Sequence, residues 1–492
     1  MRTHIPICLA ILFQAFFVGF VPAQSTFDFV LEYPVRKYSP VAIERDNGEI
    51  VAVINERTGS DYAMSSPTKG YLLSFSGAGD TITHRFSFGD SLFSINAMQE
   101  LTDGGFVLVG QAYAADSEPL NLMIVKLDNS LNKVWTRYYD MSAYYSLDVR
   151  KIFQLNGQYL FALDVCVFPC TRAIYKLVWF DALGNMGNNY THFVEGRGHS
   201  DWILNIDSTQ LWAFTPGLAG GTGQRVRLEF DTAQQFIGQT ALPFVSGTDN
   251  YHNVIWQTDS TFIYSCEYDR PNPASSNDQD MWLISFDSSL NIIDSCHFGS
   301  FNTIDKASVF RDVAFKNPDS IYFIGFKDQH IGKPPVGRVN WIMAGQTDSR
   351  LEPRYLHFIG GDYYYESYYV VATRDGGSFI CASRFNHATQ VYDPVFLKLN
   401  NLGLLTANSA QHIELKKTAF WPIPCADLIN FESAEQNILL RLYDIAGKIA
   451  LEKRLPDTRG IIQTNHLPEG VYLYELHYKN GAVEKGKIVK AY

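Results

Sequence analysis

Residues 103–140 read DGGFVLVGQAYAADSEPLNLMIVKLDNSLNKVWTRYYD, and this stretch contains the pattern that decides the fold. The turn sequence Asp103-Gly104-Gly105 precedes the apolar run FVLVG, and a second turn at Asp128 separates NLMIVKL from the aromatic run KVWTRYY. Glycine accepts positive φ and short Asx side chains bond the backbone, so both turns predict β-hairpins. The stretch therefore predicts strands that pair in an antiparallel sheet.

Both turns recur along the chain. The first begins at residues 46, 103, 156, 207, 259, 319 and 375, each time before an apolar run. The second begins at residues 76, 128, 181, 231, 287, 348 and 400, out of phase with the first. Self-similarity at a steady period is the sequence signature of repeat architectures. The chain therefore reads as seven units, each with four strands, two tight turns and one variable loop.

Four antiparallel strands repeated in this way are typical of a β-propeller, whose radial arrangement leaves only short, protected edges. We predict an all-β fold with a seven-bladed β-propeller over residues 24–407. The 28 Tyr and 34 Phe residues agree, because aromatic residues suit pleated, half-buried surfaces. Residues 27–33, FDFVLEY, are predicted to complete the last blade and close the ring. An array of β-sandwiches or an open solenoid is the alternative.

The repeats lack the Trp-Asp dipeptide of WD40 blades. The second repeat, which contains DGGFVLVG and NLMIVKLDNSLNKVWTRYYD, resembles a loosely defined propeller repeat of secreted bacterial proteins. The resemblance covers roughly residues 40–407 and is close only in that repeat. It implies a fold and carries no activity.

Residues 1–23 are typical of a cleavable secretory signal peptide. Arg2 supplies a positive n-region, residues 5–21 are apolar apart from Gln14, and Val21-Pro22-Ala23 supplies small residues for cleavage before Gln24. An uncleaved membrane anchor is the alternative, although the apolar run is short for a full span. No later run reaches about 18 apolar residues, so we expect no membrane span in the mature chain.

The repeat period stops after Thr406, and residues 408–419 read as a linker. Residues 420–492 contain short alternating strands separated by turn signals at Ala446-Gly447, Pro468-Glu469-Gly470 and Asn480-Gly481. Such a pattern predicts a small Ig-like β-sandwich.

This C-terminal region closely resembles the type A sorting domain of the type IX secretion system. The features that match are the motif residues Pro422, Pro424, Asp427, Tyr443, Asp444, Gly447, Pro468, Gly470, Tyr472, Lys487 and Lys490. Ile423 departs from the Pro-Asn-Pro opening that is usual in the family. The resemblance implies recognition by the type IX machinery at the outer membrane, after export to the periplasm, with the passenger then released or attached to the cell surface. An adhesive Ig-like module is the alternative.

The formal net charge of −11, without a basic block, argues against nucleic acid or an anionic membrane as partner. Cys166 and Cys170 flank Val-Phe-Pro and could close a small disulfide loop in an exported chain. Cys266 and Cys381 lie in apolar runs and are predicted to be core residues. The thiols lack zinc-site spacing, and no cofactor is predicted.

No catalytic motif stands out, and the catalytic residues remain unknown at this stage. His192, His199 and Asp201 are close in sequence, and we expect them in a solvated loop rather than in a catalytic site. Asp278 and Asp280 are weak calcium candidates, since one Asp-x-Asp lacks the remaining ligands.

The variable loops differ in length while the tight turns hardly change, and binding sites usually lie on variable loops of a rigid scaffold. The tyrosines at the entries to the third and seventh repeats are candidate binding residues, because Tyr rings suit sugars or protein surfaces. These residues are Tyr144, Tyr145, Tyr363, Tyr364 and Tyr365. The alternative, held equal, is that the rings fill gaps between blades.

The sequence therefore favours an exported protein, secreted or held on the outer surface, whose propeller binds a glycan or a surface protein. A polysaccharide hydrolase or lyase is a rival reading, which would require carboxylates, or a His with a carboxylate, at the centre of the ring. A structural surface-layer component is the third reading.

Overall fold

The computed structural model describes residues 26–31, 36–38, 41–57, 68–76, 79–85, 92–113, 119–144, 146–166, 173–194, 199–205, 207–216, 224–245, 253–269, 278–300, 303–308, 310–329, 337–405, 411–412, 418–421, 425–433, 436–479 and 483–491. The chain divides into two compact units, the first with residues 1–30 and 34–411 and the second with residues 31–33 and 412–492. The described elements of both units are β-strands.

The described part of the first unit forms seven antiparallel sheets. The first sheet contains β2 (Arg36–Tyr38), β3 (Ala42–Glu44), β4 (Ile50–Arg57), β5 (Thr68–Phe75) and β6 (Thr81–Arg85), and the second contains β7 (Leu92–Glu100), β8 (Phe106–Tyr113), β9 (Pro119–Leu127) and β10 (Lys133–Asp140). The third sheet contains β11 (Ser146–Leu155), β12 (Gln158–Cys166), β13 (Ala173–Phe180) and β14 (Met186–Val194). The fourth contains β15 (Asp201–Leu204), β16 (Gln210–Pro216), β17 (Gln224–Asp231) and β18 (Phe236–Val245).

The other three sheets complete the unit. The fifth sheet contains β19 (Asn253–Trp256), β20 (Thr261–Asp269), β21 (Gln279–Asp287) and β22 (Ile292–Phe298). The sixth contains β23 (Lys306–Ala307), β24 (Val313–Phe315), β25 (Ile321–Lys327), β26 (Trp341–Thr347) and β27 (Pro353–Gly360). The seventh contains β28 (Tyr364–Ala372), β29 (Ser378–Asn386), β30 (Val391–Leu399), β1 (Phe27–Val30) and β31 (Gln411–His412).

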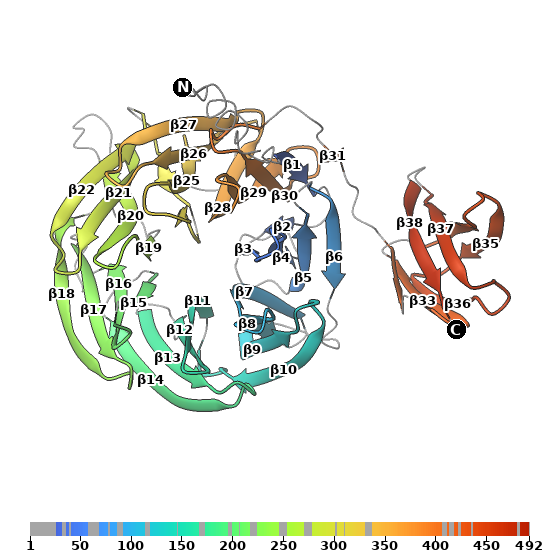
Figure 1. The fold of residues 1–492 in the computed structure, drawn as a ribbon, viewed down its shortest axis with the longest axis horizontal. Coiled ribbons are helices and arrows are strands. Elements are labelled where there is room, and N and C mark those ends of the chain that lie inside the picture. The colour runs from blue at the N-terminus through green and yellow to red at the C-terminus, as the bar shows by residue number, and fades with distance from the viewer. Residues whose placement is uncertain are drawn as a thin grey trace, which may run out of the picture. The chain divides into compact units, whose positions relative to one another are not determined.

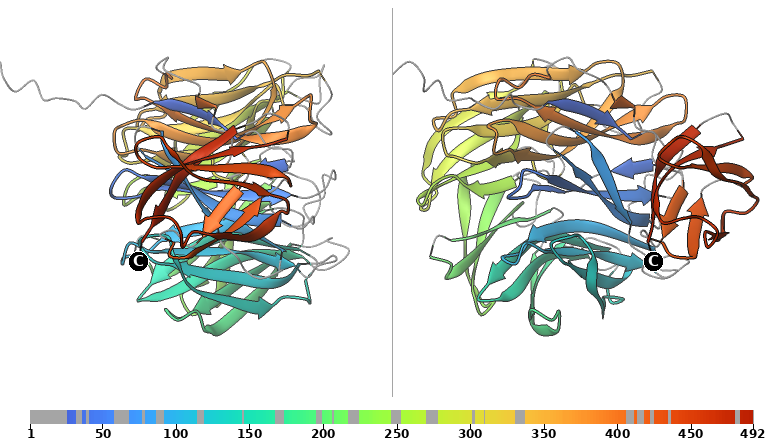
Figure 2. Two further views of the ribbon diagram at one scale, coloured as in Figure 1. Left: turned by 90° about the vertical axis from the view of Figure 1, so that its right-hand side faces the viewer. Right: turned by 45° about the vertical axis from the view of Figure 1, so that its right-hand side comes forward.

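The sheets stand around a common centre, with the first strands of each innermost and the last outermost (Figure 1). The two side views follow the same sheets in chain order by their colours (Figure 2). Strands in the middle of a sheet, such as β12, are buried along nearly their whole length because both faces pack on neighbouring sheets. The outer strand β10 is mostly exposed. The predicted all-β propeller is thus confirmed.

The N-terminal strand closes the ring, as the sequence predicts. β1 pairs antiparallel with β30, with Phe29 opposite Phe396. The ring centroids of Phe27 and Phe29 lie 5.6 and 5.5 Å from that of Phe75 in the first sheet. The pairing and the aromatic packing together join the last sheet to the first.

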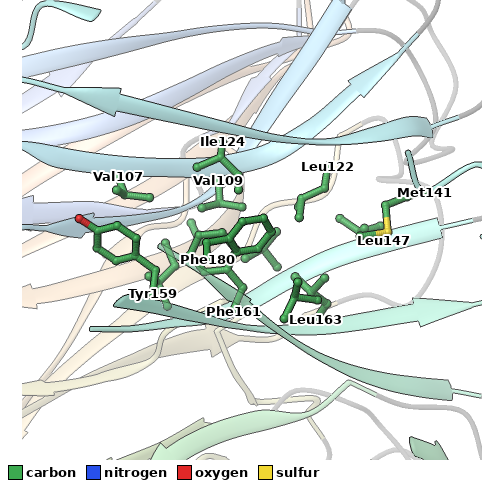
Figure 3. Packing of buried hydrophobic residues seen from close by; sticks show 14 of the residues in the cluster. Val107, Val109, Leu122, Ile124, Met141, Leu147, Tyr159, Phe161, Leu163 and Phe180 are labelled. Carbon is green, nitrogen blue, oxygen red and sulfur yellow. The ribbon is translucent and has the colours of Figure 1, made fainter. Parts of the chain in front are cut away.

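Hydrophobic clusters fill the spaces between neighbouring sheets. Between the second and third sheets, Val107 and Ile124 from one side face Phe161 and Phe180 from the other (Figure 3). All four side chains are at most 1% exposed. Burial of such side chains contributes roughly 1.5–3 kcal/mol each, so these contacts supply much of the stability of the ring.

The second tight turn of each repeat has one geometry wherever its Asx residue is described. At Asp128, Oδ1 accepts the N–H groups of Ser130 and Asn132 at 2.9 and 2.8 Å, and Leu131 has φ of 63°. Asp287 and Leu290 repeat this arrangement. The carboxylate replaces backbone partners at the turn, which explains why Asx residues recur there.

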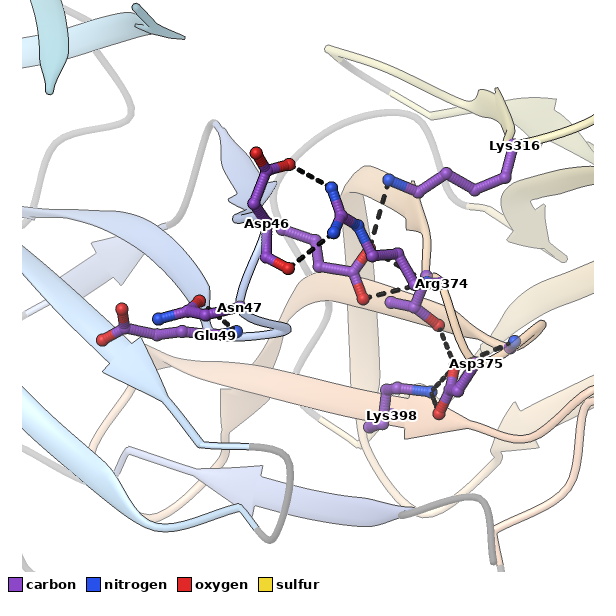
Figure 4. A network of polar contacts seen from close by, with 10 residues as sticks. Asp46, Asn47, Glu49, Lys316, Arg374, Asp375 and Lys398 are labelled. Carbon is purple, nitrogen blue, oxygen red and sulfur yellow. Dashed lines mark hydrogen bonds and ion pairs between the residues drawn. The ribbon is translucent and has the colours of Figure 1, made fainter. Parts of the chain in front are cut away.

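Polar contacts also join the last sheet to the first (Figure 4). In the turn between β28 and β29, Arg374 Nη1 donates to the carbonyl oxygen of Asp46 at 2.5 Å. The Arg374 N–H donates to Glu44, whose Oε2 lies 3.1 Å from Lys316 Nζ. The pair of Arg374 with Asp46 is exposed, and exposed pairs contribute little each, so it adds specificity to the closure more than stability.

The second unit has two sheets around a core of its own. One sheet contains β32 (Thr418–Trp421), β33 (Leu428–Ser433) and β36 (Arg459–Gln463), and the other β34 (Ile438–Tyr443), β35 (Ile449–Leu455), β37 (Gly470–His477) and β38 (Val483–Lys490). Ile429 and Ile462 from the first sheet share one buried cluster with Leu440, Leu442 and Tyr474 from the second. The predicted small β-domain at the C-terminus is confirmed.

Candidate functional site

A cavity of about 330 Å³ lies among the innermost strands of the first unit, and we call it the central cavity. Each of the seven sheets contributes to its lining: Val41 and Ile43, Asn96–Glu100, Val149–Ile152, His199–Asp201, Asn253, Phe310 and Arg311, and Tyr369. Ligand sites are concave and hold a few convergent polar groups. The central cavity is therefore the candidate site.

His199, which lines this cavity, lies beside two carboxylates. Its Nδ1 is 3.8 Å from Asp148 Oδ2 and 3.8 Å from Asp164 Oδ2. Asp148 comes from β11 and Asp164 from β12, while His199 precedes β15, so two sheets meet here. The distances exceed those of a hydrogen bond, which leaves the imidazole able to bond another group.

Asp164 is fixed by its surroundings. It accepts Arg150 Nε at 2.7 Å, the N–H of Ser200 at 2.9 Å and the hydroxyl of Ser200. Burial raises the pKa of Asp164, and the Arg150 charge and the Ser200 bonds oppose that shift. The Ser200 hydroxyl in turn accepts Trp202 Nε1 at 2.6 Å. The carboxylate is thus fixed by Arg150 and Ser200, two residues that line the cavity.

Asp201 links neighbouring innermost strands. Oδ2 accepts the N–H of Val254 at 2.7 Å, and Oδ1 accepts the N–H of Trp202 at 2.8 Å. Lys151 Nζ lies 3.6 Å from Oδ1. Asp201 is only 7% exposed, so the expectation that it lies in a solvated loop is wrong; hydrogen bonds to backbone N–H groups compensate its burial.

Arg311 enters the cavity from the sixth sheet. Its Nη1 donates to Tyr369 Oη at 3.0 Å, and Nε donates to the carbonyl of Val313 at 3.2 Å. The adjacent Asp312 is fully buried and accepts the Ser265 hydroxyl at 2.7 and 2.6 Å. Burial raises the pKa of Asp312 to about 7. Arg150, Asp164 and Arg311 were not singled out from the sequence, because no local motif marks them.

The five tyrosines predicted as binding residues differ in burial. Tyr364 and Tyr365 are 3% and 7% exposed and pack in hydrophobic clusters, so their rings offer no free face. Tyr363 is half-buried, with Arg384 Cζ 4.5 Å from its ring centroid. Tyr144 is half-buried against the core and Lys176, and Tyr145 lies outside the described residues. Only Tyr144 and Tyr363 thus keep the tyrosine prediction open.

The weak calcium candidates Asp278 and Asp280 are 2% and 1% exposed. Neither oxygen of Asp278 has a hydrogen-bond partner. Within the described part of the chain, no group of three or more His, Cys, Asp or Glu side chains is placed to hold a metal ion. The two carboxylates therefore gain no third ligand of those types there.

Cys266 and Cys381 are fully buried, as predicted for core residues. Cys166 is in a disulfide, and its predicted partner Cys170 lies outside the described residues. The predicted signal peptide, residues 1–23, also lies outside them. In the part of the chain that the structure describes, no helix has the length and apolarity that a bilayer crossing needs.

The sorting-motif residues take turn and packing positions in the second unit. Asp444 Oδ1 accepts the N–H groups of Ala446 and Lys448 at 2.9 Å, and Gly447 has φ of 78°. Tyr472 donates to the carbonyl of Pro468 at 2.6 Å, before Gly470 at φ of 151°.

Other motif residues lie near the chain end. Lys490 is buried and donates to the carbonyl of Thr464 at 2.6 Å, with Asp427 4.0 Å away. Tyr443 donates to Glu475 at 3.1 Å, and Lys487 is exposed. Pro422 and Pro424 lie outside the described residues.

Known proteins were compared with this chain by structure and by sequence. Among solved structures, the chain is similar to the β-propeller domain of the Trilobed protease from Pyrococcus furiosus, at 10% identity and a TM-score of 0.38, over 76% of this chain and 98% of that one. It is also similar to Trypanosoma rangeli sialidase, at 10% identity and a TM-score of 0.38, over 76% of this chain and 57% of that one. These scores carry no functional assignment.

A search of curated proteins finds no match. The family model described as the secretion system C-terminal sorting domain matches residues 419–491. Residues 419–491 are therefore a type IX sorting domain, which implies that the chain is exported through the type IX secretion system.

Proposed function

We propose that the exported propeller is a binding module for glycans, and that the ligand enters the central cavity. The observation that carries the proposal is the lining itself. Hydrogen-bonding side chains from separate sheets, among them Asn96, Lys151, Asn253 and Arg311, converge on one cavity of about 330 Å³. A sugar presents donors and acceptors in close alternation, and planar amide, carboxylate and guanidinium groups match them.

A variant that fills the cavity tests this proposal. Asn96→Trp places a large ring in the lining, and it should abolish glycan retention by the purified full chain on a glycan array. Ser130→Trp, in an exposed turn, is the matched control and should bind as the wild type does. Unchanged binding by a folded Asn96→Trp protein, or no retention of any glycan by the wild type, would overturn the proposal.

A second candidate is a polysaccharide hydrolase, favoured by the position of His199 beside Asp148 and Asp164. A protonated imidazole could donate a proton to the leaving glycosidic oxygen while a carboxylate takes one from the attacking water. Incubation of the chain with a polysaccharide panel should then release reducing ends, and His199→Gln should abolish the release. Binding without release, at equal strength in both proteins, would leave the binding module as the function.

A further inference from the structure

Arg311 is a cation in the wall of the central cavity without an ion pair among the described residues. Its two bonds go to neutral acceptors, Tyr369 Oη and the carbonyl of Val313. A guanidinium without a directly paired carboxylate can form charge-assisted bonds with an anionic ligand. Arg311 therefore brings to the cavity a cation that no described carboxylate pairs directly.

The nearby acids do not supply that anion. Asp201 and Asp312 act on Arg311 through space and form no direct bond with it. Asp201 already accepts two backbone N–H groups and lies near Lys151. Asp312 holds the Ser265 hydroxyl, and because its pKa is raised to about 7 it carries only part of a charge at neutral pH.

Two further cations line the same cavity. Lys151 has a side chain that is 35% exposed. Arg150 donates to Asp164 only through Nε, and its Nη2 is buried without a hydrogen-bond partner. The lining thus holds three cations and His199. Asp164 pairs with Arg150, Asp201 lies near Lys151, and Asp148 and Asp164 lie beside His199, so Arg311 is the lining cation for which the described residues show no paired carboxylate. Burial and the charge of Asp46 raise the pKa of Glu100, and the charges of Arg45, Arg374 and Lys316 oppose that shift.

We propose that the central cavity takes an acidic sugar, whose anionic group binds at Arg311 with Lys151 beside it. The inference rests on the proposed glycan binding and names its ligand class. A carboxylate matches the two-pronged geometry of a guanidinium, and charge-assisted bonds are about twice as strong as neutral ones. The chain's overall negative charge has little effect on the binding of an anionic sugar, because distant surface charges are screened beyond about 8 Å at physiological salt.

Paired sugars test the ligand side without altering the protein. The mature full chain is titrated with oligogalacturonate, with its fully methyl-esterified form and with a sulfated neutral oligosaccharide. We expect the oligogalacturonate to bind at least about tenfold more tightly than its ester, and binding should weaken as salt rises. Tighter binding of the sulfated sugar would assign the anion as sulfate. Equal binding of acid and ester overturns the inference alone, whereas binding of no member of the series overturns the glycan proposal as well.

Charge-removing variants test the protein side. Arg311→Gln should lower affinity for the oligogalacturonate by about tenfold and Lys151→Gln by roughly threefold, with affinity for the ester unchanged. Lys126→Gln is the matched control, because it removes one lysine paired with Asp103 on the surface and should bind normally. Lys151 is partly exposed, so Lys151→Gln remains informative if Arg311→Gln does not fold. A folded Lys151→Gln protein that keeps full preference for the acid overturns the inference.

Discussion

The side-chain amide of Asn55 bonds both backbone groups of Ile95: its Oδ1 accepts the N–H at 2.9 Å and its Nδ2 donates to the carbonyl at 2.7 Å. Asn55 lies on β4 of the first sheet and Ile95 on β7 of the second. Gln111 and Asp164 reach the next innermost strand in the same manner, bonding Leu147 and Ser200. Neighbouring sheets are thus joined by backbone-like bonds as well as by hydrophobic contact.

Replacement of Asn55 by leucine should lower the free energy of unfolding by about 2–4 kcal/mol, because two buried backbone groups lose their partner. Chemical denaturation of the purified chain measures this. Asn132→Ala, at an exposed turn, should cost well under about 1 kcal/mol. If Asn55→Leu lowers the free energy of unfolding no more than the control does, the bonds of Asn55 to Ile95 do not stabilise the contact between the two sheets.

Truncation of Phe29 should open the ring closure. Phe29 is 2% exposed and contacts Phe75 and Phe396, so Phe29→Ala should cost about 3–5 kcal/mol. Thermal unfolding and limited proteolysis would report it, with early cleavage in the last or first sheet. Ile82→Ala changes a side chain that is 61% exposed and should leave the melting temperature nearly unchanged.

Leu131 combines positive φ with burial, at 63° and 3% exposure. Leu131→Gly relieves about 1 kcal/mol of backbone strain but loses more in buried area, so a net loss of roughly 1–2 kcal/mol is expected. Asn156, with φ of 50°, is exposed. Asn156→Gly should therefore be neutral or slightly stabilising. The two substitutions should have opposite or clearly unequal effects in denaturant melts.

Asp312 should make stability depend on pH. Its pKa is raised in the folded state to about 7 from an ordinary value of 3.8, so the folded chain binds the proton more tightly. This contribution is complete below about pH 4 and is lost as pH rises toward 7. The difference in melting temperature between Asp312→Asn and wild type should grow in favour of the variant across that range. A constant difference would show that Asp312 does not titrate there.

Removal of Phe420–Tyr492 should block export while the propeller stays folded, because the second unit has its own core. Fractionation of expressing cells should find the truncated chain inside the envelope, and circular dichroism of the purified product should retain its β signal. Surface or medium levels equal to those of the full chain would rule out the sorting role.

The repeated hairpins of the fold could be predicted from the sequence, whereas most residues of the central cavity could not. Turn residues such as Asp128 and Asp287 act locally, so their pattern predicted the hairpins, and the apolar run at Phe27 predicted the closing strand. The cavity groups come from strands far apart in the chain, such as Arg150 and Arg311. The innermost strands β15 and β19 have only four residues each, so their polarity pattern does not reveal which side chains face the centre.

The pairing of Phe29 with Phe396 determines how early the ring can close during synthesis. The strand β1, the earliest that the structure describes, must remain without its partner while some 367 further residues are added, which takes roughly 20–70 s at about 5–20 residues per second. Pairing over such a sequence separation is intrinsically slow. A chain whose ring closes only when its synthesis is nearly complete stays incompletely folded for the whole of that interval.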